Sequence, residues 1–509
     1  MKRIGGFLVP ALILLSGTVL WATNYYVANW GSDSYRGLSW DSAFATLQHA
    51  ANQVAAGDSV RVANGDYAGF DLRTPGAAGL PIVFQGAGDS VRITADNGVT
   101  TDGINVEDAD WAVIDGFRVI GRTRAGIRVA VAQHVAVRNN VCDNNGRWGI
   151  FTGFADYALI ENNVCSYSQA EHGIYFSNSA DHPVIRHNIS HHNHGCGIHM
   201  NGDASMGGDG LITDATVEGN IAYENGAGGG SGINCDGVAD SRIYNNLLYL
   251  NHASGISLYR IDAAQGSFRD EIFNNTVLNA ADGRWCLNIS DASTADTIYN
   301  NVFINLHSWR GSIAIDSASQ TGFFSDYNIV MDRMSADGGN TRLTLAQWRG
   351  LGYDGHSQLA DSLDSIFVNW PGGDYHLRPG AQAVDSGTAL VAGIVTDDLD
   401  GLARPQGNGF DIGAYEYHAG RIGEADERPD DPAAGDRMVR KGQFLAFPEV
   451  GSGALVRIYD CLGRTIVTLT GRPGSGAKWW TGAIPKGVYF YIATAAGGDR
   501  RAGGKILVY

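Results

Sequence analysis

The 509-residue chain is long enough for more than one domain, and its 53 acidic and 36 basic side chains give a formal net charge of -17. This charge argues against a nucleic-acid partner and, unless a local cationic patch overrides it, mildly against a polyanionic sugar. Lys2 is followed by no other lysine before Lys441, so any cationic group between them is Arg, His or a bound metal.

Residues 1–22 have the pattern of a secretory signal peptide. Lys2 and Arg3 precede an apolar run from Phe7 to Trp21, and Ala22 is a small residue at which cleavage could fall. The run is too short and wrongly flanked for a membrane span, and no later stretch approaches the ~20 apolar residues that cross a bilayer. We therefore expect a protein that is secreted or held at the cell surface, with no membrane span.

A short amphipathic helix is predicted to start at Ser42, which can cap it. Its apolar residues recur at helical spacing: Phe44, Leu47, Ala51 and Val54. A turn at Gly57-Asp58 leads into a strand at residues 60–62. A helix in this position covers the open end of the apolar core of a strand repeat.

From Gly103 to Gly255 the dipeptide Gly-Ile returns at a nearly fixed interval. Its glycines stand at positions 103, 126, 149, 173, 197, 232 and 255, so the spacings are 23, 23, 24, 24, 35 and 23 residues. An aliphatic residue three positions before an Asn recurs in step, from Val137 and Asn140 to Ile298 and Asn301. Such a period without helical pattern is typical of a solenoid of strands.

We therefore predict a parallel β-helix in which the Ile or Val of each coil packs inward on its equivalent in the next coil, ~4.8 Å away. The Asn markers are expected to tolerate a left-handed backbone at turns and to hydrogen-bond along the stack. The six cysteines have no metal-site spacing such as C-x-x-C. Cys142 and Cys165 follow successive Asn markers, and we favour a buried pair over a disulfide.

The pattern changes after the coils. Residues 331–360 are less regular, with a short helix predicted at 344–349, and residues 361–417 end in DDLDGLARPQGNGFDIGAYEY. The aspartates Asp397, Asp398 and Asp400 could hold a cation, but turn formation is favoured. Residues 418–436 are charged and rich in Pro, Gly and Ala, which is typical of a linker. Strands near 455–459, 465–470, 488–493 and 505–508 predict a small β domain.

The opening segment, the coils and the closing segment together resemble the secreted right-handed parallel β-helix proteins of the pectate-lyase-like superfamily, over residues 25–417. This resemblance implies an all-β fold and, frequently, polysaccharide lyase activity. The final GVYFYIATAAGGDRRAGGKILVY resembles C-terminal sorting domains of the type IX export route, although the Pro448 region lacks the usual Pro-Asn-Pro opening. A plain accessory β-sandwich is the alternative for this domain.

The expected organisation is therefore a signal peptide at 1–22, a β-helix with an N-terminal capping helix at 23–417, a linker at 418–436 and a β-sandwich at 437–509. The last domain is expected to engage export machinery. We expect the protein to be a monomer.

Strand alternation predicts which side chains face outward. If each Ile of Gly-Ile is interior, the next residue is exterior. That exterior column reads Arg128, Phe151, Tyr175, His199, Asn234, Ser257, and the column two residues further reads Gly153, Ser177, Asn201, Asp236, Tyr259. Arg260 follows directly. Titratable and amide groups are unusual on a sheet face, where Thr, Ser and Val are common. We therefore predict that this face carries function.

The same region contains the longest coil, between Gly197 and Gly232, with its excess in residues 201–214 and 226–230. Such insertions leave a solenoid as loops and often shape the binding face. Asp203, Asp209 and Asp214 fit a calcium site in this loop as well as they fit an ordinary loop. Seven of the 14 histidines lie between residues 172 and 199. Those of the turn (187, 191, 192 and 194) favour a solvated turn, with a zinc or copper site as the alternative.

Three classes of activity remain open. The first is β-elimination or C5 epimerisation of a uronic-acid polysaccharide, which needs a base, an acid and a group that neutralises the carboxylate. The second is glycoside hydrolysis, which needs two carboxyls. The third is a non-catalytic stalk that binds sugar or metal. We predict the first, with an anionic polysaccharide as substrate and Ca²⁺ as the candidate cofactor.

The candidate residues follow from these roles. His199 is expected to act as the base and Tyr175 or Tyr259 as the acid, with Asn201, Asn234, Arg260 or a bound cation as the neutraliser. The predicted catalytic set is His199, Tyr175, Tyr259, Arg260 and Asp236. The predicted substrate-binding set is His172, Asn178, Asn201, Asn234 and Ser257. Asp203 and Asp209 are the predicted metal ligands.

Overall fold

The computed structural model describes residues 22–87 and 90–418 and, further along the chain, the strands between residues 437 and 508. The predicted signal peptide, up to residue 21, and the linker from residue 419 lie outside the described residues. The chain divides into two compact units, residues 1–417 and residues 418–509, and each is described by itself.

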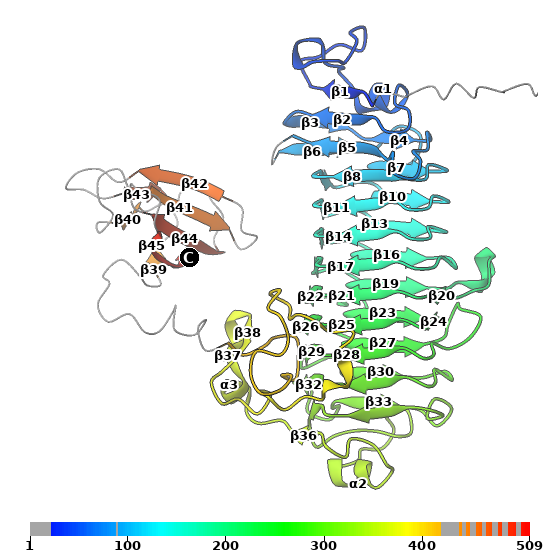
Figure 1. The fold of residues 1–509 in the computed structure, drawn as a ribbon, viewed down its shortest axis with the longest axis vertical. Coiled ribbons are helices and arrows are strands. Elements are labelled where there is room, and N and C mark those ends of the chain that lie inside the picture. Colours follow the sequence, from blue (N-terminus) through cyan, green and yellow to red (C-terminus); the bar gives the residue numbers. More distant parts are fainter. Residues whose placement is uncertain are drawn as a thin grey trace, which may run out of the picture. The chain divides into compact units, whose positions relative to one another are not determined.

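The first unit is a solenoid whose coils each contribute strands to three parallel sheets, stacked along the long axis in Figure 1. Sheet A contains β1 (Asn24–Val27), β2 (Ser59–Val62), β5 (Ile82–Gly86), β8 (Ala112–Asp115), β11 (Ala136–Arg138), β14 (Leu159–Glu161), β17 (Val184–Arg186), β21 (Thr216–Glu218), β25 (Arg242–Tyr244), β28 (Glu271–Phe273), β31 (Thr297–Tyr299) and β34 (Phe324–Asp326). Sheet B contains β3 (Gly65–Ala68), β6 (Val91–Ala95), β9 (Arg118–Ile120), β12 (Val141–Asp143), β15 (Val164–Ser166), β18 (Ile189–His191), β22 (Ile221–Tyr223), β26 (Leu247–Tyr249), β29 (Thr276–Asn279), β32 (Val302–Asn305), β35 (Ile329–Val330) and β36 (Gln358–Leu359).

Sheet C is the third sheet and carries the face that the sequence singled out. It contains β4 (Phe70–Leu72), β7 (Ile104–Glu107), β10 (Ala125–Ala130), β13 (Trp148–Gly153), β16 (Ile174–Ser177), β19 (Ile198–Asn201), β23 (Ile233–Asp236), β27 (Ile256–Tyr259), β30 (Leu287–Ile289) and β33 (Ile313–Ile315). A short ladder of β20 (Ile212–Thr213) and β24 (Val238–Ala239) joins the loops beyond β19 and β23. The predicted right-handed parallel β-helix is confirmed.

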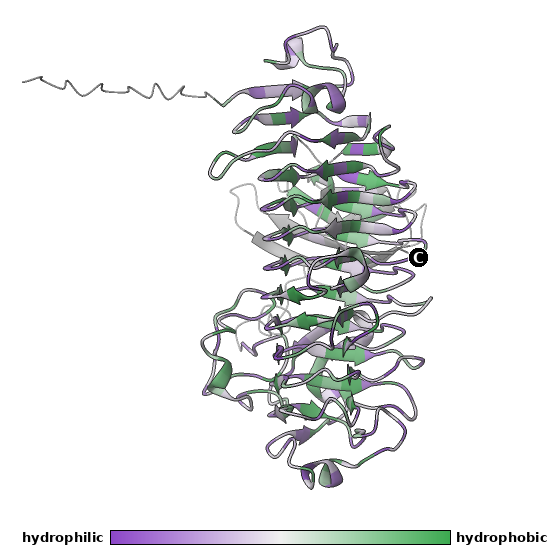
Figure 2. Ribbon diagram, turned by 90° about the vertical axis from the view of Figure 1, so that its right-hand side faces the viewer, coloured by the Kyte–Doolittle hydropathy of each residue, from purple (hydrophilic) through white to green (hydrophobic). Residues whose placement is uncertain are grey.

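The recurring isoleucines form the core, as predicted. Ile127, Ile150, Ile174, Ile198, Ile233 and Ile256 are register partners from coil to coil, and each is 0% exposed. Figure 2 shows the hydrophobic segments of the strands repeating along the solenoid. Each coil thus buries the apolar residues that its neighbours leave open, and burial of this kind is the main stabilising contribution in a repeat protein.

The Asn markers form a continuous hydrogen-bonded column at the turn between sheets A and B. We call this column the Asn ladder: Asn140, Asn163, Asn188, Asn220, Asn246, Asn275, Asn301 and Asn328. The backbone N–H and side-chain amide of Asn140 both donate to Asn163 Oδ1 at 3.0 Å, and the pattern repeats along the column. One expectation is corrected. The left-handed backbone belongs to the preceding residue, as in Asn139 (φ 55°), and not to the ladder Asn.

The N-terminal end is covered by a 3-10 turn, η1 (Trp40–Ser42), and by α1 (Leu47–Ala51). The helix starts later than predicted, because Thr46 and not Ser42 accepts the capping hydrogen bond, from His49 N. Phe44 lies before the helix and pairs with Val27 of β1. Cys142 and Cys165 are register partners with free, buried thiols, as predicted.

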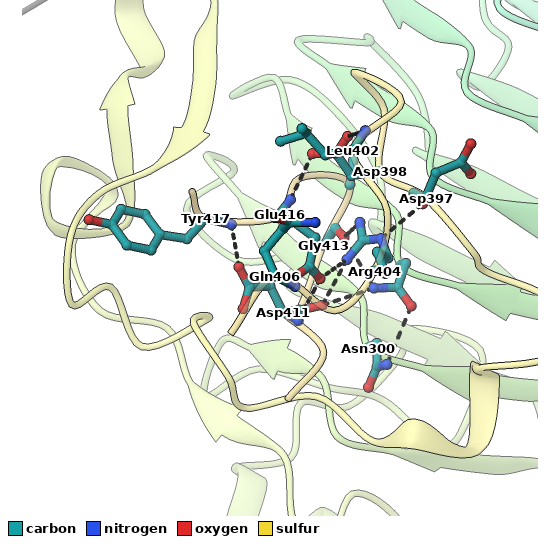
Figure 3. Close-up of polar contacts among 12 residues, drawn as sticks. Asn300, Asp397, Asp398, Leu402, Arg404, Gln406, Asp411, Gly413, Glu416 and Tyr417 are labelled. Atoms are coloured by element: carbon teal, nitrogen blue, oxygen red, sulfur yellow. Dashed lines mark hydrogen bonds and ion pairs between the residues drawn. The ribbon is translucent and has the colours of Figure 1, made fainter. Parts of the chain in front are cut away.

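The segment after the coils contains α2 (Leu345–Arg349), α3 (Leu363–Ile366), β37 (Phe367–Asn369), η3 (Trp370–Gly372), β38 (Asp374–Leu377) and η4 (Ala389–Val391). Arg404 locks its end (Figure 3): its guanidinium is 0% exposed and donates to Glu416 Oε1 at 2.7 Å and to Gly413 O at 2.8 Å. Asp398 accepts from the backbone N–H of Asp400, Leu402 and Glu416. This confirms the turn-forming role of that aspartate.

The second unit is a small β domain. Its larger sheet has the order β39 (Arg437–Val439), β45 (Arg500–Val508), β44 (Gly487–Thr494), β41 (Leu455–Asp460) and β42 (Thr465–Thr470), and its second sheet pairs β40 (Phe444–Phe447) with β43 (Ala477–Trp480). Side chains of both sheets, including Phe447, Trp479 and Ile458, share one apolar core. The two sheets and their shared core are compatible with the predicted sandwich. Over the described residues, the structure contains no helix with the length and apolar character that crossing a membrane requires.

Candidate functional site

The exterior face of sheet C brings together the predicted column. Phe151, Tyr175, His199, Asn234 and Ser257 are register partners on β13, β16, β19, β23 and β27. The residues between the two exterior columns are interior and 0% exposed: Phe176, Met200, Cys235 and Leu258. The strand register inferred from Gly-Ile is therefore confirmed.

A chain of hydrogen bonds runs through two histidines of this face. The backbone N–H of Cys196 donates to His172 Nδ1 at 3.0 Å, and His172 Nε2 lies 3.0 Å from His199 Nδ1. Because a backbone N–H can only donate, the neutral His172 ring carries its proton on Nε2. It therefore donates to His199 Nδ1, and the neutral His199 ring carries its own proton on Nε2.

This chain ends at the hydroxyl of Tyr259. His199 Nε2 lies 3.3 Å from Tyr259 Oη, and Asn234 Nδ2 donates to the same oxygen at 2.6 Å. The phenol oxygen thus accepts two hydrogen bonds, so its own proton is left to point away from both donors. We call His172, His199, Asn234 and Tyr259 the relay.

The electrostatics of the relay agree with neutral rings. Burial lowers the pKa of His172 to about 4, and burial together with the neighbouring His172 lowers the pKa of His199 well below its usual range. Burial, with the thiol of Cys196 and the carboxyl of Asp236 nearby, raises the pKa of Tyr259. At neutral pH both imidazoles are uncharged and the phenol keeps its proton.

Tyr175 lies on the other side of His199. Its ring stacks on the His199 ring with centroids 5.1 Å apart, and its Oη accepts from Asn201 Nδ2 at 3.0 Å. Burial raises its pKa to about 12, and the carboxylates of Asp203, Glu171 and Asp262 add to the shift. Two phenols, each with an amide donor at its oxygen, therefore flank one imidazole.

Asp236 has a structural position. Its carboxylate is 1% exposed and accepts from the backbone N–H of Ile261, Asp262 and Ala263 at 2.8, 2.9 and 3.3 Å. These bonds fix the turn that directly follows Tyr259. Arg260 belongs to this turn and is exposed, and its guanidinium has no partner among the described residues.

Two predicted substrate-binding groups are engaged within the protein. Both nitrogens of His172 are used, by Cys196 N and by His199. Ser257 is 7% exposed, and its Oγ lies 2.9 Å from Ser231 Oγ. Asn178 is 8% exposed in a left-handed turn (φ 64°) after β16. Asn201 and Asn234 of the predicted binding set donate hydrogen bonds to the tyrosines, and the His172 ring packs edge-on against Tyr175.

Among the described residues, Asp203, Asp209 and Asp214 of the long loop form no group of three ligand side chains close enough to share one metal ion. Asp203 accepts from Ser205 N and Ser205 Oγ, and Asp209 accepts from Leu211 N, so each carboxylate closes its own turn. Of the turn histidines, His191 and His192 contact each other, with their Nδ1 atoms 2.9 Å apart, but they form no group of three metal-ligand side chains within the described part of the chain. Over the residues that the structure describes, one group of three side chains could hold a metal ion: His172, Cys196 and His199. Their ligand atoms all lie within 4.8 Å of one another.

The direction of the hydrogen bond at His172 argues against a metal ion bound by His172, Cys196 and His199. A histidine that binds a metal through one nitrogen donates the N–H of the other to an acceptor. His172 Nδ1 instead faces a donor, the backbone N–H of Cys196. A metal on His172 Nε2 would place two N–H groups against each other, and burial also raises the pKa of the Cys196 thiol to about 12. The geometry fits the relay better than a metal.

Trp148 was not predicted from sequence as part of this site. The Trp148 ring lies 4.6 Å from Phe151 and 5.7 Å from Tyr175, its Nε1 donates to Glu171 Oε2 at 2.7 Å, and Arg147 lies 4.4 Å above it. A signal was present: Trp148, His172 and Cys196 each directly precede a Gly-Ile. Strict alternation places these positions inward, so the pattern did not place the Trp148 ring against Phe151 and Tyr175.

Comparison with known proteins supports the fold. A family model described as "Right handed beta helix region" matches residues 90–228. The pectate lyase Pel9A structure is 16% identical with a TM-score of 0.54, covering 78% of this chain and 96% of that chain. XylC in complex with xylose is 10% identical with a TM-score of 0.50, covering 78% and 98%. An alginate lyase from Paenibacillus sp. str. FPU-7 is 18% identical with a TM-score of 0.40, covering 61% and 96%. No curated relative matches the sequence. At these identities the likeness shows the fold alone.

Proposed function

We propose that the protein is a polysaccharide-active enzyme that moves a proton at C5 of a uronic-acid residue, as a lyase by β-elimination or as a C5 epimerase. The observation that carries this proposal is the Tyr259 hydroxyl, which accepts from both Asn234 and His199. The similar folds of a pectate lyase and of a xylose-bound protein make a sugar polymer the natural ligand.

Tyr259 is proposed as the general acid. Its proton is free to point at a bound substrate, because the two other directions at the oxygen are taken by donors. When the proton leaves, the same two N–H groups stabilise the phenolate without moving. In β-elimination this proton goes to the leaving glycosidic oxygen as the C4–O bond breaks and the C4–C5 double bond forms.

His199 is not the base in this arrangement, which changes the expectation from sequence. Its Nδ1 accepts from His172 and its Nε2 donates to Tyr259, so neither nitrogen has a lone pair for substrate. We propose that Tyr175 is the base that removes the C5 proton. Asn201 Nδ2, which donates to the Tyr175 hydroxyl, would stabilise its phenolate. With two tyrosines as acid and base, the site can also deprotonate on one side and reprotonate on the other, which is epimerisation.

Arg260 is proposed to neutralise the substrate carboxylate. Carboxylate neutralisation is required because removing the C5 proton places negative charge next to that group. Arg260 is the residue after Tyr259, is exposed, and has a guanidinium without a partner in the described part of the chain. A planar guanidinium binds a carboxylate through two N–H groups, so no calcium ion is needed for this step.

The hydrolase alternative is weakened by Asp236. It was the best-placed carboxyl on the face, and it is committed to three backbone amides. Asp203 and Asp262 remain, both on loops, and Asp203 is bonded within its own turn. A glycosidase needs one carboxyl protonated and one free at a defined separation.

We further propose that the protein acts outside the cytoplasm, with the second unit as a sorting domain that export machinery recognises. The first 22 residues and the C-terminal strands support this assignment. Detection of the intact chain in the culture medium or on the cell surface, and its retention inside cells after deletion of residues 437–509, would test it.

The reaction is tested by incubating the purified protein with a panel of uronate polymers in D₂O. Ultraviolet absorbance of an unsaturated product identifies elimination, and deuterium at C5 of uncleaved polymer identifies epimerisation. Either result supports the proposal. New reducing ends without chromophore or deuterium would replace it with hydrolysis, and retention of the protein on a glycan column without turnover would replace it with binding.

A further inference from the structure

We infer that His172 is a positioning residue that holds His199 in the Nε2–H tautomer, so that the Tyr259 proton is kept for substrate. This inference rests on the proposed function of Tyr259. Its first readout needs no substrate, so its failure and the failure of the proposed function can be told apart.

The direction in which hydrogen bonds are donated along the relay is set by the backbone N–H of Cys196. The turn that carries this amide is pinned: Gly195 N donates to Glu171 O at 2.7 Å, and Gly173 N donates to Cys196 O at 3.0 Å. The His172 ring packs against the turn so closely that a Cβ on Gly195 would lie 2.6 Å from its Nδ1. The ring therefore has little room to turn, and its Nδ1 must accept.

The direction of every later bond follows from this one. His172 donates from Nε2 to His199 Nδ1, and His199 donates from Nε2 to Tyr259 Oη. In a Ser-His-Asp triad a carboxylate accepts from the histidine, which leaves the other nitrogen free as a base. In the relay, His172 occupies the place of that carboxylate but donates a hydrogen bond to His199 instead of accepting one. The hydrogen bonds therefore run in the opposite direction, and His199 donates to Tyr259.

The groups around the two rings keep them neutral, which the tautomer argument requires. His172 faces Glu171, which favours its charged form, and Arg147, which opposes it, while burial outweighs both. His199 faces His172 and is stacked by Tyr175. No carboxylate of the described residues hydrogen-bonds to either ring, so neither is drawn to the imidazolium form.

Three substitutions at position 172 separate polarity from packing. His172→Gln keeps an acceptor for Cys196 N–H and a donor for His199. His172→Phe keeps a ring and removes both polar groups. His172→Glu presents only acceptors, so it would draw the His199 proton to Nδ1. His307→Gln is the matched control, because His307 Nδ1 also accepts backbone N–H groups, from Trp309 and Arg310, on another coil.

The experiment is ¹⁵N NMR of histidine-labelled protein, with His199 assigned by loss of its signal in His199→Asn, followed by turnover on the active polymer. We expect a protonated Nε2 in the wild type, in His172→Gln and in His307→Gln. His172→Glu should move the proton to Nδ1, and it and His172→Phe should lose about 10²-fold in turnover at unchanged melting temperature. His172→Gln should retain most activity.

Three results would overturn the inference. One is a protonated Nδ1 on His199 in the wild type. Another is wild-type tautomer and turnover in His172→Phe, which would show that the ring only packs. The third is stoichiometric zinc or copper in protein purified without chelator, because the metal would occupy His172 Nε2. A protonated Nε2 in a wild type that turns over no uronate would instead reject the proposed function and leave the relay polarity standing.

Discussion

The Asn ladder and the relay are both columns of polar side chains on successive coils, and they differ in what they leave unsatisfied. In the ladder every coil repeats the same bond, and each amide is consumed by the next coil, as Asn188 is by Asn220. In the relay each coil contributes a different group, and the chain ends at a phenol proton that has no acceptor in the described part of the structure. The repeated Asn–Asn hydrogen bonds stabilise the solenoid, whereas the non-repeating relay leaves the Tyr259 hydroxyl available for chemistry.

The ladder should show the largest effect on stability. Asn220→Ala removes an Oδ1 that accepts from Asn188 N and Nδ2, and an Nδ2 that donates to Ile185 O and Asn246 Oδ1, all buried. We expect the free energy of unfolding to fall by ~3–4 kcal/mol, measured by denaturant titration. A loss below ~1 kcal/mol would mean that the column is not a structural element.

Arg260 should show a large effect on activity, although it lies outside the relay. Arg260→Gln removes the cation that faces the substrate carboxylate, and we expect kcat/KM on a uronate polymer to fall by ~10²-fold with the melting temperature unchanged. Arg242→Gln is a suitable control, because Arg242 is an exposed arginine of sheet A paired with Glu271. Equal activity of both variants would remove Arg260 from the mechanism.

Activity should rise with pH if Tyr175 is the base. Its pKa is raised to about 12 and a base must be deprotonated, so the reactive fraction grows about tenfold per pH unit below that value. Tyr259 keeps its proton over the same range, because its pKa is also raised. The measurement is kcat/KM from pH 7 to 10. A bell-shaped profile centred near pH 6 would instead indicate a histidine base.

A smaller effect is expected at two buried aspartates, Asp270 and Asp296, which directly precede strands β28 and β31 of sheet A. Asp270 and Asp296 are 0% and 1% exposed, and the Oδ2 of each has no partner within the described residues. Burial raises the pKa of Asp296 to about 8, from 3.8. Because the folded pKa is raised, this group favours folding most below pH 4, and that contribution is lost as pH rises to 8.

Asp296→Asn should therefore stabilise the protein by ~1–2 kcal/mol at pH 8 and by less at pH 5. The amide keeps the acceptor that Asp270 N uses and replaces the unpaired oxygen by a donor. Thermal unfolding at the two pH values tests this. Equal stability of both proteins at pH 8 would show that the carboxyl is satisfied.

The same contrast explains what could be predicted from sequence. Gly-Ile and the Asn markers recur, so their period identified the solenoid, the interior isoleucines and the shared face of Tyr175, His199 and Tyr259. The positive-φ turns were assigned one residue late, because Asn139 and Asn140 are both Asn and the pattern does not say which one turns. Periodicity places side chains on a face but does not set the direction of a hydrogen bond.

The proposed roles of the site residues depend on backbone N–H groups, which a pattern of side chains in the sequence does not reveal. His172 was expected to bind substrate and His199 to act as a base, and the roles that we now propose for both differ because of one backbone N–H, that of Cys196. Asp236 was expected to be catalytic, yet it holds three backbone amides of the turn after Tyr259. Backbone donors become visible only when the turns are placed in three dimensions.

The most direct measurement compares wild type and Tyr259→Phe in turnover of a uronate polymer and in thermal unfolding. Removing one hydroxyl at the end of the relay should lower turnover by at least ~10³-fold, while stability changes by less than about 1 kcal/mol. Turnover within a few-fold of wild type in a folded Tyr259→Phe protein would contradict this prediction, because the Tyr259 hydroxyl would then not be required to supply the proton.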